Sequence, residues 1–143
     1  MGLVVEIPIE EELAKAVCQG DLMLCHLAQQ HGARNYNRML EIATINGNSE
    51  LCIQALEWGA TDYNIMLRRA AQYGHGWLCS LAKDYGATNF NEMLVCAAYS
   101  GNARLCQRAR YWGATYYSGM YTMGKVAGHE DICSLAHEWS KTQ

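Results

Sequence analysis

The stretch from Gly59 to Tyr85, GATDYNIMLRRAAQYGHGWLCSLAKDY, is one copy of a unit that recurs every 27 residues. A Gly-Ala pair opens each regular copy, and six other positions of the unit also keep one residue type or one chemical class. These columns include Gly32, Gly59, Gly86 and Gly113; Gly20, Gly47, Gly74, Gly101 and Gly128; Cys25, Cys52, Cys79, Cys106 and Cys133; Met39, Met66, Met93 and Met120; and Tyr36, Tyr63, Phe90 and Tyr117. A fixed period between about 20 and 50 residues is typical of a stacked array of repeats.

The spacing of apolar residues inside one unit predicts two helices. In the first half Met66, Leu67 and Ala70 fall on one face of a helix, and in the second half Leu78 and Ala82 do the same. A glycine after each half predicts a left-handed residue that ends the helix at little steric cost. Each unit is therefore expected to be a helix, a tight turn, a second helix and a short link.

Polar residues before the helices are the expected caps, because their side-chain oxygens can accept hydrogen bonds from the free backbone N–H groups of a first turn. The first helix of a unit is expected to be capped by Asn37, Asn64 and Asn91. The second helix is expected to be capped by Asp21, Asn48 and Asn102.

These residues resemble the ankyrin repeat. The family pattern of a capped first helix, Ala-Ala, Gly-His, a hydrophobic pair and Gly-Ala can be read in Asn64, Leu67, Ala70, Ala71, Gly74, His75, Leu78, Cys79, Gly59 and Ala60. An ankyrin repeat has about 33 residues, and the missing residues belong to the link that forms a projecting hairpin finger in the family. The chain looks like the short finger-less ankyrin-like repeats that are plentiful in giant DNA viruses, and the resemblance covers about Ile9 to Trp139.

The predicted fold is an all-α solenoid of about five stacked helix-turn-helix units in one domain over residues 1–143. The units are about 6–31, 32–58, 59–85, 86–112 and 113–139, with the first and last as caps and a short extended lead-in over residues 1–8. A leucine-rich repeat also fits the period, but its Leu-x-Leu alternation is absent.

Both end units depart from the pattern. Glu10, Glu11 and Glu12 make the first turn of the chain polar, as a terminal unit requires. In the last unit Gly119 and Gly124 lie inside the first helix, which is therefore expected to be the least stable helix.

Composition excludes several classes of function. A net charge of −3 favours neither nucleic acid nor an acidic membrane face. No basic leader precedes an apolar run, and no run of about 20 apolar residues occurs, so neither a signal peptide nor a membrane span is expected. The seven cysteines are odd in number and five belong to one column, which indicates free buried thiols in a reducing compartment, the cytoplasm, or the host cytoplasm for a viral protein.

Candidate chemistry is sparse. His129, Cys133 and His137 have the spacing of metal ligands on one helix face, and a metal-binding protein is the first alternative reading. Residues 119–125 match the phosphate-binding pattern G-x-x-x-x-G-K, but Val126 stands where the hydroxyl ligand of Mg²⁺ is required. No catalytic triad can be assembled, and Arg104, Arg108 and Arg110 form a single basic spot. The chain is therefore expected to be no enzyme and to need no cofactor.

The columns that vary between units indicate the exposed surface, because packing does not restrict them. Ankyrin-like stacks bind partners on the face of their first helices. The predicted partner-binding residues are Arg68, Arg69, Gln72, Tyr73, Tyr99 and Trp77. The expected function is a monomeric, non-enzymatic module that binds another protein, and the second alternative is a structural part of a larger assembly such as a virion.

Overall fold

The computed structural model describes residues 8–142, and this range holds ten α-helices and no strand. The expected all-α architecture of repeated helix pairs is confirmed. Of the predicted extended lead-in, residues 1–7 lie outside the described residues. The helices are α1 Ile9–Gln19, α2 Leu22–Gln30, α3 Tyr36–Ile45, α4 Ser49–Glu57, α5 Tyr63–Gln72, α6 Gly76–Tyr85, α7 Phe90–Tyr99, α8 Ala103–Tyr111, α9 Tyr117–Val126 and α10 Glu130–Ser140.

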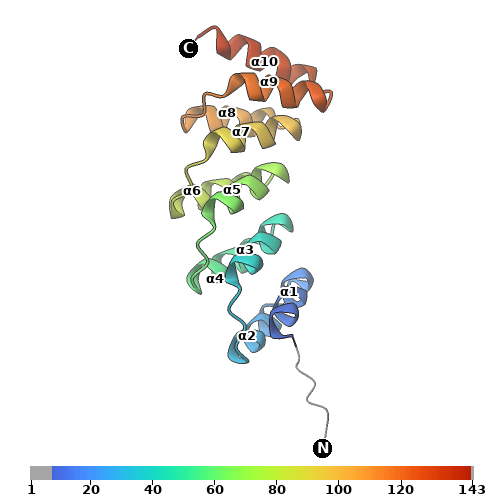
Figure 1. The fold of residues 1–143 in the computed structure, drawn as a ribbon, viewed down its shortest axis with the longest axis vertical. Helices are drawn as coiled ribbons and strands as arrows, with labels where there is room; N and C mark the ends of the chain where they lie inside the picture. Colours follow the sequence, from blue (N-terminus) through green and yellow to red (C-terminus); the bar gives the residue numbers. More distant parts are fainter. Residues whose placement is uncertain (1–7, 143) are drawn as a thin grey trace, which may run out of the picture. The chain divides into compact units, whose positions relative to one another are not determined.

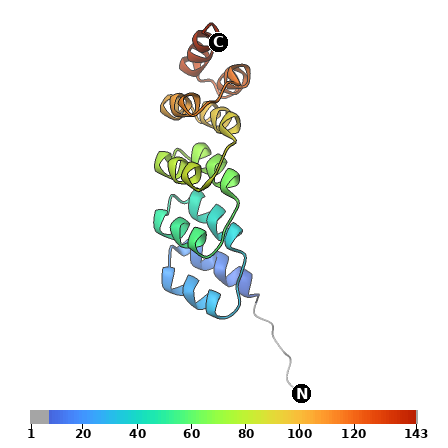
Figure 2. The ribbon, with the colours of Figure 1, turned by 90° about the vertical axis from the view of Figure 1, so that its left-hand side faces the viewer.

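The contacts divide the chain into two compact units, and each is described by itself. Unit 1 ends at Asp62 and contains the helix pairs α1–α2 and α3–α4, with α1 packed on α3 (Figure 1). Unit 2 begins at Tyr63 and contains three pairs, with α5 packed on α7 and α7 on α9. In unit 2 the first helices of the pairs lie in one layer and the second helices in another (Figure 2).

The turn inside each helix pair has the geometry that the sequence predicts. The glycine after every first helix has a positive φ, for example 70° at Gly47 and 75° at Gly101. The next residue then caps the second helix in three pairs. Asp21, Asn48 and Asn102 each accept a hydrogen bond from the backbone N–H three residues later, at 3.0–3.1 Å.

The predicted role of the other asparagine column is wrong. Asn64 is the second residue of α5 and does not cap it. Its Oδ1 instead accepts hydrogen bonds from the backbone N–H groups of Thr88 and Asn89, at 2.8 and 3.1 Å, in the link that leads to α7. Asn37 and Asn91 hold the links before α5 and α9 in the same way. These side chains therefore fasten one helix pair to the next link along the chain.

Glu10 occupies the same column in α1, and its carboxylate accepts hydrogen bonds from the next link as the asparagine side chains do. Its two oxygens accept from the backbone N–H groups of Arg34 and Asn35, at 2.6 and 2.8 Å. Glu11 beside it pairs with Arg38 at 2.9 Å. The acidic first turn of α1 thus contacts the second helix pair of unit 1, in addition to making the first turn polar.

Replacing Asn64 with Ala is expected to lower the free energy of unfolding by about 1–2 kcal/mol, because two hydrogen bonds are lost at about 0.5–1.5 kcal/mol each. Asn64→Asp is the matched control, since it keeps the acceptor oxygen that Glu10 shows to be sufficient. Urea denaturation measures both variants. Hydrogen exchange at the amides of Thr88 and Asn89 should speed up in the Ala variant alone, and unchanged exchange there would contradict the assigned role.

The core repeats with the sequence. The Met, Leu and Ala columns of the first helices are almost fully buried from Met39 to Met120, as are the Cys and Ala columns of the second helices. An aromatic pair closes the open end of four helix pairs, with ring centroids 5.5–5.9 Å apart. Within residues 8–142 the one buried polar side chain is Thr44, whose hydroxyl donates to the carbonyl oxygen of Leu40 at 2.6 Å.

The packing around α9 explains why glycine stands at two positions inside this helix. The ring of Tyr116 lies where a Cβ at Gly119 would project, and Ile132 lies where a Cβ at Gly124 would project. Ile132 takes the place of the leucine found in the same column at Leu78 and Leu105. The β-branched side chain of Ile132 therefore fills the space that the methyl group of an alanine at position 124 would occupy.

Candidate functional site

The first-helix layer of unit 2 carries a shallow depression of about 300 Å³. Its residues come from three successive first helices, α5, α7 and α9. They are Arg68, Arg69, Gln72, Val95, Cys96, Tyr99 and Met123. The structure thus brings together four of the six predicted partner-binding residues, because regular packing aligns equivalent positions of neighbouring helix pairs.

The polar side of this depression is held by a small network. Arg68 forms an ion pair with Glu92 at 3.1 Å, and the Nη1 of Arg69 donates to Oε1 of Gln72 at 2.9 Å. The hydroxyl of Ser100 donates to the backbone carbonyl oxygen of Gln72 at 2.7 Å and so ties the end of α5 to the end of α7. Neither arginine is a free cation. The polar side is therefore held by specific contacts, and the charge of Arg68 is paired with that of Glu92.

The other side of the depression is apolar. Val95 and Cys96 lie half-buried beside Tyr99, whose side chain is 54% exposed, and Met123 continues the surface onto α9. Sequence reasoning missed Met123 and its exposed neighbour Val126. The signal was present, since Met123 and Val126 follow Cys96 and Tyr99 by one repeat period. The surface therefore extends to the last helix pair.

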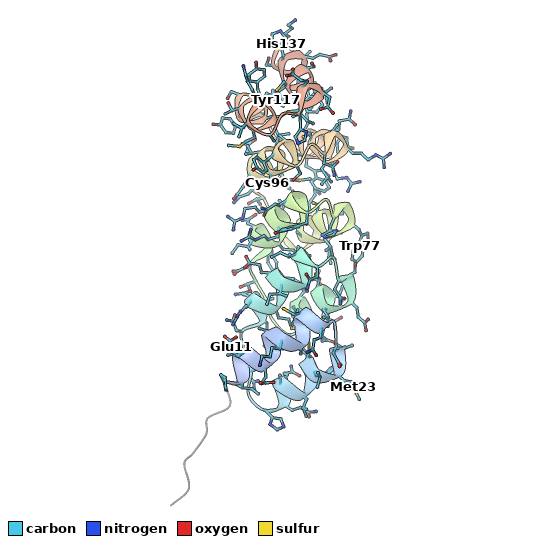
Figure 3. The ribbon with its side chains drawn as sticks, turned by 90° about the vertical axis from the view of Figure 1, so that its right-hand side faces the viewer. Glu11, Met23, Trp77, Cys96, Tyr117 and His137 are labelled. Atoms are coloured by element: carbon cyan, nitrogen blue, oxygen red, sulfur yellow. The ribbon has the colours of Figure 1, made fainter. Side chains whose placement is uncertain are left out.

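Two predicted residues stand apart from the depression. Tyr73 is half-exposed just after the end of α5 but does not line it. Trp77 belongs to α6 in the second-helix layer and lies on the opposite side of unit 2 from Cys96 (Figure 3). Its side chain is 55% exposed. Trp77 is therefore an exposed aromatic residue that does not belong to the same surface.

No protein-family model matches the chain, and no curated protein matches its sequence. The site must therefore be interpreted from its own geometry and chemistry.

The residues of the alternative metal site have three different environments. The Nε2 of His129 lies 3.2 Å from the carbonyl oxygen of Tyr99 and its ring lies against Gly101. Cys133 is buried and contacts the carbonyl oxygen of Tyr121, whereas His137 is exposed. Over residues 8–142 no group of three His, Cys, Asp or Glu side chains is placed to hold a metal ion.

The thiols of the cysteine column have an environment that disfavours reaction. Burial raises the pKa of Cys25 and Cys52 to about 11 and that of Cys79 and Cys106 to about 12. Because the thiolate is the nucleophile and the metal ligand, these groups are inert at neutral pH. Burial also raises the pKa of Cys96 in the depression. Cys18 is the exposed cysteine of the described residues.

The cations of α6 and α8 stack on aromatic rings. Lys83 and Arg108 lie over the ring of Trp112, and Arg110 lies over the ring of Trp139 at 4.8 Å from its centroid. Arg108 also donates to the carbonyl oxygen of Gly76 at 2.9 Å. Two members of the basic spot, Arg108 and Arg110, thus have structural contacts.

Among the ten helices of residues 8–142, none combines the length and the apolar character that a membrane span requires.

Proposed function

We propose that this chain is an ankyrin-like, non-enzymatic interaction module that binds a partner protein at the α5–α7–α9 depression. The observation that carries the proposal is the placement of Val95 and Tyr99 on α7 and of Met123 on α9, beside a polar network that includes Arg68 and Arg69 of α5. Tyrosine and arginine are enriched among the few residues that carry most of the binding energy at protein interfaces.

The framework under this surface supports the same proposal. The depression spans the first helices of the three packed helix pairs in unit 2, and the hydrogen bond from Ser100 to Gln72 joins the end of α7 to the end of α5. Side chains held in this way lose little conformational entropy when a partner binds. The surface combines apolar and polar groups, which suits a folded protein partner better than a strongly charged polymer.

The free buried thiols and the resemblance to repeats of giant DNA viruses support a cytoplasmic setting for the interaction, in the host cytoplasm for a viral protein. The repeat pattern supports the ankyrin-like assignment through the glycine and capping columns that the structure contains.

The test compares capture of cellular proteins by the wild-type chain and by two variants. Tyr99→Ala and Arg69→Ala are each expected to weaken binding of a captured partner by about 2 kcal/mol, which is about 30-fold in the dissociation constant. Stability should change by no more than about 0.5 kcal/mol for Tyr99→Ala, because its side chain is exposed. Quantitative mass spectrometry identifies the partner, and titration with the purified partner gives the affinity.

Tyr111→Ala is the control, because Tyr111 is 88% exposed on α8 in the other layer and is also a tyrosine. A partner that binds all the variants equally would place the interface elsewhere on the chain. Concentration-dependent self-association in light scattering, with no partner captured, would instead favour a role in a larger assembly.

A further inference from the structure

Unit 1 carries an apolar groove of about 460 Å³ between α1 and α2, on the side away from α3 and α4. Its apolar residues are Ile9, Ala16, Leu24, Leu27 and Ala28. Leu24 is 41% exposed and Leu27 is 50% exposed. Glu12 and Lys15 lie at its rim and approach one another to 4.0 Å.

The groove exposes a surface that the rest of the chain buries. The residues equivalent to Leu24 in the later helix pairs are Leu51, Leu78, Leu105 and Ile132, and their side chains are 0–3% exposed. Leu24 is thus a leucine like most of its column, although it is the one residue of the column whose side chain is exposed to solvent. Burying such side chains is favourable because it removes apolar surface from water, so an occupant of the groove gains a hydrophobic driving force.

The last helix pair does not offer the matching surface. Its α9 has Tyr121 and Lys125 where the earlier first helices have buried leucine and buried Val, Thr or Ala. Both residues are exposed. A second copy placed head to tail would therefore bury a lysine against the groove, which is costly without a partner for its charge.

The segment directly before the groove has the matching chemistry. Residues 1–7, MGLVVEI, contain five large apolar side chains and join the described chain at Pro8. Pro8 has an extended backbone, with φ −71° and ψ 92°, and the next residue, Ile9, lines the groove. Tethering keeps the local concentration of this segment high, at about the millimolar level or above for a short flexible link.

We propose that this groove binds the N-terminal segment of its own chain, residues 1–7, in an extended conformation along α1. Alternation of side chains in an extended chain would direct Leu3, Val5 and Ile7 to the groove and leave Glu6 toward solvent. Seven extended residues span about 23 Å. The eleven-residue helix α1 is about 16 Å long, so the segment is long enough to cover the groove.

The test is disulfide trapping in the full chain. Leu3, Val5 and Ile7 are replaced by Cys one at a time, each together with Leu27→Cys, in a Cys18→Ser background that removes the exposed thiol. The control pairs the same three positions with His26→Cys. His26 is adjacent in sequence, but its ring packs on Trp58, which directly follows α4, away from the groove. Oxidised glutathione accepts the two electrons of the new bond.

At least one Leu27→Cys pair is expected to form an intramolecular disulfide about tenfold or more faster than its His26→Cys control, because occupancy of the groove raises the local thiol concentration. The triple variant L3S/V5S/I7S should also lower the melting temperature by about 5 °C. Equal trapping rates for all three matched pairs would overturn the proposal. A wild-type dimer that Leu27→Ser dissociates and L3S/V5S/I7S does not would overturn it as well, by placing a second copy in the groove.

Discussion

Leu78→Ala will lower the free energy of unfolding by about 2–5 kcal/mol. Leu78 is 2% exposed in α6, and its column equivalents Leu51 and Leu105 are equally buried. Removing the side chain loses the transfer free energy of its methyl and methylene groups and leaves a cavity that a tightly packed helix array fills only in part. The unfolding midpoint in urea, measured by circular dichroism, gives the change.

Tyr111→Ala is the matched control for this loss, because it also removes a large side chain, but one that is 88% exposed. It should change stability by no more than about 0.5 kcal/mol. If Leu78→Ala also changes stability by no more than about 0.5 kcal/mol, the column of Leu51, Leu78 and Leu105 does not form the core of the second helices. Binding through the α5–α7–α9 depression should be retained by Leu78→Ala under conditions in which the protein is folded.

Gly124→Ala will destabilise the protein by about 1–3 kcal/mol although it removes a glycine from a helix interior. A Cβ at this position would lie 2.8 Å from Cγ2 and 3.1 Å from Cβ of Ile132. Ile132 is fully buried, and its branched side chain cannot rotate away. The helix propensity of alanine, about 1 kcal/mol better than that of glycine, offsets only part of the overlap.

Ile132→Leu is expected to rescue Gly124→Ala, because the double variant restores the combination present at Ala70 with Leu78 and at Ala97 with Leu105. Thermal unfolding of the two single variants and the double variant measures the coupling between the positions. A stabilising effect of Gly124→Ala alone would show that α9 and α10 move apart easily, and that the glycine is not required by Ile132.

The local parts of the fold could be predicted well. The positions of the helices, the turn glycines and the caps at Asp21, Asn48 and Asn102 depend on interactions within three or four residues. The period of 27 residues then predicted which residues share a column and hence which are buried. For the same reason Arg68, Arg69, Gln72 and Tyr99 could be placed on one surface before their helices were seen together.

The sequence by itself thus determined the helix pairs, the repeat register and the buried columns, because each follows from backbone capping and a regular apolar spacing. Only the tertiary structure showed that Asn64 holds the link at Thr88 and Asn89, since that contact joins residues 24 and 25 positions apart. It also separated Trp77 from the depression, matched Gly124 to Ile132 and left the groove at Leu24 and Leu27 open. These outcomes depend on which side of each helix is covered by a neighbouring helix. The repeat pattern of the sequence predicts that coverage only for units that have the same neighbours, and the first and last units do not.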